Sequence, residues 1–220
     1  MTGHPHEHEH EHEHDQFTAE FWDERYRSAH ALWSGNPNPY LIAEAGDLAP
    51  GTALDAGAGE GADAIWLAGR GWQVTAVDIS GVALERAAGH AAQAGRDVAG
   101  RITWRREDLL EWQPPERAYD LVNAQFLHLP AGIRQRVFGR LAAAVADGGT
   151  LLIVGHHPLD LDTTMPRPRQ PELLFTGDEL AAAFGDGWKI ETNVAAAREA
   201  ADPDGRPVTI HDTVFRARRA

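Results

Sequence analysis

The chain has 220 residues, 43% of them hydrophobic, and its 33 acidic and 20 basic side chains give a formal net charge of −13. That length can bury one hydrophobic core, and the acidic balance excludes broad affinity for nucleic acid, which requires a basic surface. The absence of cysteine excludes disulfides and thiolate ligands, and no apolar run approaches the roughly 18 residues of a membrane span. We therefore expect a cytoplasmic protein that acts on small molecules and contacts neither nucleic acid nor membrane.

Residues 1–15 alternate histidine and glutamate and offer no apolar face to a core. We expect a disordered tail here, followed by a single domain over residues 16–220. The tail is either a solvated extension or affinity tag, or a segment whose imidazoles capture transition metal ions weakly. Neither interpretation gives it a catalytic role.

Residues 16–48 have apolar positions three to five residues apart, which predicts a helix with one apolar stripe. The stripe consists of Phe17, Phe21, Trp22, Tyr26, Ala29 and Leu32. A loop rich in proline, glycine and asparagine follows at residues 33–39, and a short helix runs through Leu41, Ile42 and Ala45. Such a stripe is more often part of the core than of a ligand site.

Residues 53–80 predict a strand, a glycine turn, a helix and a second strand. Asp55 ends the first strand, and Gly57, Gly59 and Gly61 form a turn that lets the backbone approach a ligand closely. Asp78 ends the second strand about 20 residues after the turn, where a ribose would lie. The third glycine comes one residue too early for a pyrophosphate fingerprint, so the spacing favours a nucleoside. A tight turn that binds nothing is the alternative.

The rest of the chain continues this alternation. A helix is expected over residues 81–94, a strand over 101–106, a strand over 119–126, a helix over 132–145, a strand over 150–154, a helix opening at Thr176, a strand over 188–194 and a last strand over 207–216. Strands that alternate with helices specify a doubly wound α/β sheet, with ligands at the carboxyl ends of its strands.

Two segments resemble a known family. The run LDAGAGEG followed by VDIS resembles the first two motifs of class I S-adenosylmethionine-dependent methyltransferases. The block FWDERY…WSGNPNPYL is similar to the N-terminal extension of tellurite- and thiopurine-type methyltransferases. Over residues 17–219, the resemblance implies a Rossmann-like seven-stranded sheet with an antiparallel last strand, an N-terminal helical lid and S-adenosylmethionine as cofactor.

The resemblance also implies roles for individual residues. The glycine turn would face the methionine part of the cofactor, Asp78 the ribose, Ile79 the adenine ring and Asp108 the adenine amino group, although Asp108 can also be read as a helix cap. Trp22, Tyr26 and Trp33 are lid candidates. The predicted cofactor site comprises Trp33, Asp55, Gly57, Gly59, Gly61, Asp78, Ile79, Asp108 and Leu109.

Four of the six histidines outside the tail map to the carboxyl edge of the predicted sheet: His128, His156, His157 and His211. A neutral imidazole can remove a proton from an acceptor near pH 7, and we predict His156 or His157 as that base. His211 and Asp212 would orient it, and only one of these two can face the pocket because they alternate on a strand. Three histidines binding a metal (His156, His157 and His211), or simple packing at the edge, are the alternatives.

The proline-rich loop 158–171 is either a lid over the acceptor, in which Arg167 and Arg169 could pair with an anion, or a solvated loop. Arg198 is a further candidate for an anion contact. It follows Ala197, whereas tellurite-type enzymes have a His-Arg pair here, which counts against tellurite, and the lack of cysteine counts against arsenite. We predict methyl transfer to a small molecule through oxygen, nitrogen, sulfur or a metalloid. The alternative is a non-catalytic cofactor-binding or metal-binding sensor.

Overall fold

The computed structural model describes residues 17–168 and 170–220. The predicted tail at residues 1–15 and the predicted anion contact Arg169 lie outside the described residues. The elements in chain order are α2 (Ala19–Ser28), α3 (Pro39–Ala45), β1 (Thr52–Ala56), α4 (Ala62–Gly69), β2 (Gln73–Asp78), α5 (Gly81–Ala94), α6 (Arg96–Ala99), β3 (Ile102–Arg106), β4 (Tyr119–Gln125), α7 (Ala131–Ala144), β5 (Val145–His156), η1 (Pro158–Asp162), η2 (Pro171–Leu173), α8 (Gly177–Phe184), η3 (Gly185–Gly187), β6 (Trp188–Ala201) and β7 (Pro207–Arg219).

The strands form one seven-stranded sheet in the order β3-β2-β1-β4-β5-β7-β6, with β7 antiparallel to both of its neighbours. This confirms the predicted Rossmann-like α/β sheet with its antiparallel last strand. The strand order reverses between β1 and β4, and in open α/β sheets ligands bind outside the carboxyl ends of the strands at such a switch point.

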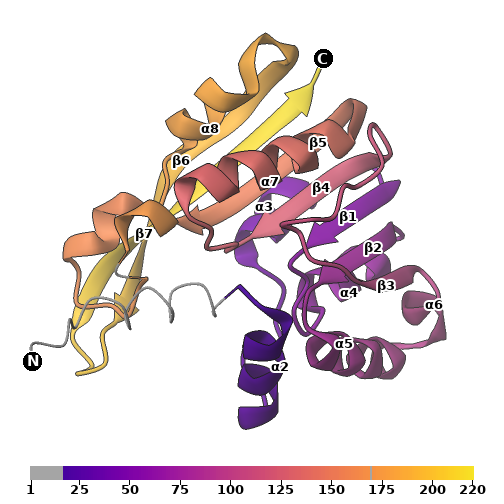
Figure 1. Cartoon of the computed structure of the whole chain (residues 1–220), viewed down its shortest axis with the longest axis horizontal. Coiled ribbons are helices and arrows are strands. Elements are labelled where there is room, and N and C mark those ends of the chain that lie inside the picture. Colours follow the sequence, from indigo (N-terminus) through magenta and orange to yellow (C-terminus); the bar gives the residue numbers. More distant parts are fainter. Residues whose placement is uncertain (1–16, 169) are drawn as a thin grey trace, which may run out of the picture.

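Helices cover both faces of the sheet (Figure 1). On one face α7 and α8 enclose a core that contains Phe138, Phe175 and Phe215. On the other face α3 and α4 pack Leu41 and Leu67 against the sheet. The central strands are buried on both sides, which explains why they read as continuous apolar runs rather than alternating ones.

The N-terminal helix is shorter than the apolar stripe predicts. α2 ends at Ser28, and of the stripe residues only Tyr26 is fully buried. Beyond Ser28 the backbone bonds to other elements, because the Ala29 carbonyl accepts from Arg86 and the Leu32 amide donates to Glu60. Tertiary hydrogen bonds therefore override the local helical pattern.

The β6–β7 hairpin is longer than expected. β6 continues to Ala201 instead of ending near residue 194, and β7 continues to Arg219 instead of 216. Most of β6 is exposed because it is the edge strand, so its alanine-rich second half lacks the apolar alternation that marks a half-buried strand. β5 also begins earlier than predicted, at Val145.

No helix in the described part of the chain is long and apolar enough to cross a membrane. The cytoplasmic location stays a prediction.

Packing around β5 gives a stability test. A Cβ added at Gly155 would lie 2.5 and 2.6 Å from ring carbons of the buried Phe175, so Gly155→Ala overpacks the core and should lower the free energy of unfolding by about 1–3 kcal/mol. Gly89→Ala is the matched control, because no atom lies within 4 Å of the added Cβ in α5, and it should raise that free energy by up to about 1 kcal/mol. Urea unfolding measures both. Equal stability of the two variants contradicts this packing.

Candidate active site

The turn between β1 and α4 requires its three glycines. Gly57, Gly59 and Gly61 have φ angles of +77°, +53° and +86°, a region that side chains disfavour. Added Cβ atoms would also meet Leu127 at 2.5 Å from Gly57 and Trp104 at 2.7 Å from Gly61. The backbone and its packing therefore explain the glycines, whatever the turn binds.

Asp78 fixes this turn to the end of β2. Its Oδ2 accepts from the Gly59 amide and its Oδ1 from the Ser80 amide, both at 2.8 Å. The carboxyl group is buried, and this burial raises its pKa against the opposing effect of the backbone donors. The predicted ribose contact thus lies at the turn, held in one orientation.

A cavity of about 570 Å³ opens beside Asp78's neighbour Ile79. Its lining includes Ile79, Asp108 and Leu110, together with Phe17 from the segment before α2. The two residues predicted to contact adenine therefore share one cavity. Leu110, rather than the predicted Leu109, is among the lining residues, and both leucines pack against the core.

The adjoining ends of β1 and β4 carry a polar cluster that the sequence prediction found only in part. Asn123 is fully buried and donates to Asp55 at 2.9 Å and to Asp63 at 3.3 Å, and Gln125 donates to Asn123. Burial, followed by the charge of Asp63, raises the pKa of Asp55 far above its usual range. Polar Asn123 inside an apolar strand was the available signal.

This cluster has more acceptors than donors. Asp55 Oδ2 and Gln125 Oε1 are buried, and neither has a hydrogen-bond partner among the described residues. Buried acceptors of this kind call for a donor. The ammonium group of a methionine-containing cofactor supplies donors and positive charge, so the cluster fits S-adenosylmethionine.

The predicted lid residues lie against the turn. Trp33 Nε1 donates to Tyr26 Oη at 3.0 Å, and a Cβ added at Gly59 would lie 3.0 Å from that same oxygen. Burial raises the pKa of Tyr26, so its hydroxyl stays protonated. Trp33 itself is half exposed, while Trp22 packs its ring near Tyr26.

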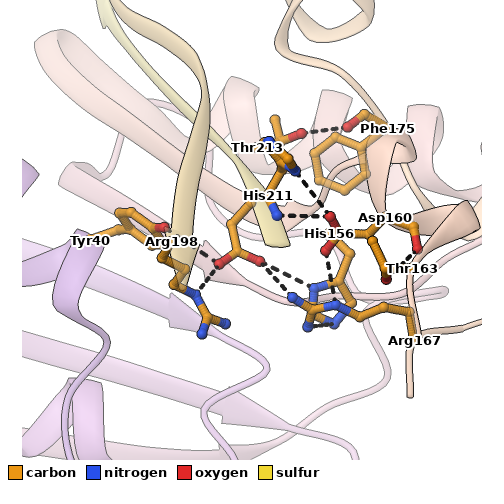
Figure 2. Close-up of polar contacts among 10 residues, drawn as sticks. Tyr40, His156, Asp160, Thr163, Arg167, Phe175, Arg198, His211 and Thr213 are labelled. Carbon is orange, nitrogen blue, oxygen red and sulfur yellow. Dashed lines mark hydrogen bonds and ion pairs between the residues drawn. The ribbon is translucent and has the colours of Figure 1, made fainter. Parts of the chain in front are cut away.

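The histidines at the far strands separate onto two faces of the sheet. On the face of α3, His156 Nδ1 lies 3.3 Å from Asp212 Oδ1 and His156 Nε2 lies 3.2 Å from Arg167 (Figure 2). Asp212 is fully buried and also accepts from Arg198 Nε at 2.9 Å and Tyr40 Oη at 3.4 Å. Although burial opposes it, these donors hold the pKa of Asp212 below its usual range.

Burial lowers the pKa of His156, which leaves its imidazole neutral. In the tautomer that satisfies both contacts, Nδ1–H donates to Asp212 and Nε2 accepts from the Arg167 guanidinium. A neutral imidazole that is oriented by a carboxylate is the arrangement that general bases use.

On the opposite face, His157 and His211 have structural contacts. His157 Nδ1 accepts from the Leu159 amide and caps η1, while His211 Nδ1 lies 3.2 Å from Asp160. Their rings are 6.5 Å apart. His211 and Asp212 thus point to opposite faces, as strand alternation predicted. Among the described residues, no group of three histidine, aspartate or glutamate side chains is placed to hold a metal ion.

Two more rings complete the His156 face. The His128 ring stacks on His156 with centroids 4.7 Å apart, and Phe126 lies 4.8 Å from His156. Phe126 has φ of +52°, a strained conformation for an aromatic residue, and such strain concentrates at functional sites. His128 is predicted at this edge from the sequence, whereas Phe126 is not, because its backbone strain has no sequence signal.

The glycine turn, the acidic end of β2 and the strand order define a class I methyltransferase fold. A protein-family model described as a methyltransferase domain matches residues 53–149. A 2-heptyl-1-hydroxyquinolin-4(1H)-one methyltransferase of Mycobacteroides abscessus is 27% identical over 187 residues, covering 81% of this chain and 77% of that protein.

Two solved structures share the fold. TehB from Haemophilus influenzae has a TM-score of 0.67 at 18% identity, covering 92% of this chain and 67% of that one. A Burkholderia thailandensis 1,6-didemethyltoxoflavin-N1-methyltransferase, solved with its substrate and S-adenosylhomocysteine, has a TM-score of 0.64 at 19% identity, covering 100% and 92%. These matches support a class I methyltransferase that depends on S-adenosylmethionine.

The partly buried His128 gives a pH test. Burial and the neighbouring His156 lower the pKa of His128 to about 3, whereas the pKa of a histidine in the unfolded chain is about 6.5. Between these values only the unfolded state binds the proton, so falling pH lowers the free energy of unfolding by up to about 1.4 kcal/mol per pH unit. His128→Phe keeps a ring and removes the titrating nitrogens. Urea unfolding from pH 7.5 to 4.5 should show a shallower slope for this variant, and an unchanged slope contradicts the assignment.

Proposed function

We propose that the chain methylates a small-molecule acceptor bound against Phe126, His128 and His156, with His156 as the base. The observation that carries this is the neutral, carboxylate-oriented imidazole of His156 at the same sheet edge as the acceptor-rich cluster of Asp55. Such an edge brings a cationic cofactor and a deprotonable acceptor together. Of the two histidines predicted as the general base, we therefore prefer His156, oriented by Asp212, to His157.

The cofactor side of the proposal assigns each group a task. Asp78 holds the ribose, Ile79 and Asp108 receive the adenine, and the cluster of Asp55 and Gln125 receives the methionine ammonium. The bound cofactor supplies an electrophilic methyl group on a sulfonium. The protein's own contribution is mainly to hold the acceptor about 3–3.5 Å away in line with it.

The acceptor side accounts for the proton. His156 Nε2 takes it from the acceptor heteroatom, and the imidazolium that forms is stabilised by Asp212. Arg167 and Arg198 pair with the anionic heteroatom as it forms. For Nε2 to accept, the Arg167 N–H now bonded to it must shift onto that anion. S-adenosylmethionine, held by the cofactor residues named above, would supply the methyl group that this heteroatom receives.

The aromatic lining supports a planar acceptor that carries an acidic O–H, N–H or S–H group. The relative named for a hydroxyquinolinone and the neighbour named for a didemethyltoxoflavin both act, by their names, on ring systems. Residues 16–220 form one catalytic domain in this proposal. The His/Glu tail has no part in transfer, and its weak metal capture stays a prediction.

Asp78→Asn tests the cofactor site. An amide offers one acceptor oxygen instead of two and no charge, so the Kd for S-adenosylmethionine should rise about 10- to 100-fold in isothermal titration. Asp97→Asn, an exposed aspartate on α6, is the matched control and should bind like the wild type. Undiminished binding by Asp78→Asn overturns this role.

His156→Phe tests the base. The ring contacts remain but no nitrogen can take a proton, so kcat should fall about 10²- to 10⁴-fold while the Kd for the cofactor stays within about threefold. Release of S-adenosylhomocysteine is measured with a panel of aromatic hydroxyl, N-hydroxy, thiol and amine compounds that includes 2-heptyl-1-hydroxyquinolin-4(1H)-one. His157→Asn keeps the cap of η1, and a larger loss in that variant than in His156→Phe would assign the base to His157 instead.

A further inference from the structure

Glu60 is a buried carboxylate inside the glycine turn. It lies between Gly59 and Gly61, and only 7% of its surface is exposed. A buried carboxylate is costly unless donors and opposite charge surround it. The groups that donate hydrogen bonds to Glu60 therefore show which segment the Glu60 side chain holds.

The donors to Glu60 come from the segment after α2. Its Oε2 accepts from the backbone amides of Leu32 at 3.2 Å and Trp33 at 3.3 Å. Its Oε1 accepts from Arg86 Nη1 at 3.0 Å, and Arg86 Nη2 donates to the Ala29 carbonyl at 2.9 Å. Glu60 and Arg86 together thus hold the backbone of residues 29–33.

A second tether lies one helical turn further on. Asp63 Oδ1, at the start of α4, accepts from the Asn38 amide at 2.7 Å. Residues 29–38, which we call the lid segment, are therefore held near their start by Glu60 of the turn and Arg86 of α5, and at their end by Asp63 of α4. Between the two tethers, residues 34–36 are exposed.

The backbone of the turn also links Glu60 to the predicted ribose contact. The amide of Gly59, next to Glu60 in the chain, donates to Asp78, the residue assigned to the ribose. A ligand that orders Asp78 and Gly59 therefore orders the backbone from which the Glu60 side chain projects. The tethers to the lid segment start from that same backbone.

We propose that Glu60 is a positioning residue that couples cofactor binding to closure of the lid segment. The proposal rests on the proposed function, because it takes S-adenosylmethionine as the ligand of the turn. Coupling between two sites is reciprocal, so removing the Glu60 carboxylate weakens cofactor binding and makes the lid segment insensitive to the cofactor. Glu60 contacts neither the acceptor nor the transferred methyl in this role.

The test measures binding and lid closure separately, with S-adenosylhomocysteine as the probe. Titration calorimetry gives its Kd, and chymotrypsin cleavage after the half-exposed Trp33, mapped by mass spectrometry, reports the lid segment. In the wild type, saturating probe should slow this cleavage. In Glu60→Ala, the Kd should rise about 5- to 150-fold and the cleavage rate should be the same with and without probe.

Two further variants keep the result interpretable. Glu60→Gln preserves the shape and one acceptor for the lid amides, but it opposes its NH₂ group to Arg86, so it should fold and show an intermediate Kd. Glu85→Gln, an exposed glutamate beside Arg86 on α5, is the matched control and should behave as the wild type. A Glu60 variant with wild-type Kd and probe-sensitive cleavage overturns the coupling. A wild type that binds no probe overturns the proposed function as well.

Discussion

A carboxylate taken out of water is stable only where donors or cations surround it, and the carboxyl edge of this sheet carries several such groups. Asp78 is satisfied by the amides of Gly59 and Ser80, and Asp212 by a histidine and two arginines. Asp160 is satisfied by His211 and Arg167. Each of these pairings fixes a loop or a strand end in place. The architecture of the site follows largely from them.

Asp55 is the exception that gives the edge its selectivity. It shares the donor Asn123 with Asp63, and one of its oxygens has no hydrogen-bond partner among the described residues. This oxygen can therefore accept a hydrogen bond from a bound ligand. A cationic ligand would stabilise the ionised form of this carboxyl group, which burial and Asp63 disfavour, whereas a pyrophosphate would oppose its ionisation further. The same sheet edge that binds dinucleotides in other α/β proteins is thus suited here to a sulfonium nucleoside.

The sequence could predict the sheet, the turn and the cofactor half of the site, because those depend on local patterns. Apolar strands, spaced glycines and an acid at a strand end are visible without the fold. The acceptor half depends on where β5 ends, since successive residues at a strand end point to opposite faces. His156 and His157 therefore separate, and His156 joins Asp212 while His157 caps a 3₁₀ turn.

Hydrogen bonds between residues far apart in the chain could not be predicted from the sequence. Glu60 meets Leu32 and Asn123 meets Asp55, partners 28 and 68 residues apart. A lone glutamate in a turn and a lone asparagine in a strand look like solvent-facing residues until the fold brings their partners to them. The apolar stripe predicts too long a helix for the same reason, because the residues after α2 bond to Glu60 of the turn and to Arg86 of α5 instead of to the helix.

The central claim is that one nucleoside cofactor lies across the turn, the end of β2 and the residues after β3, beneath the lid segment. Amide hydrogen exchange of the full chain, with and without S-adenosylhomocysteine, tests it most directly. The account predicts slower exchange at residues 57–61, 78–80 and 107–110 and in the lid segment. Exchange that is unchanged there, or slowed only elsewhere in the chain, would contradict it.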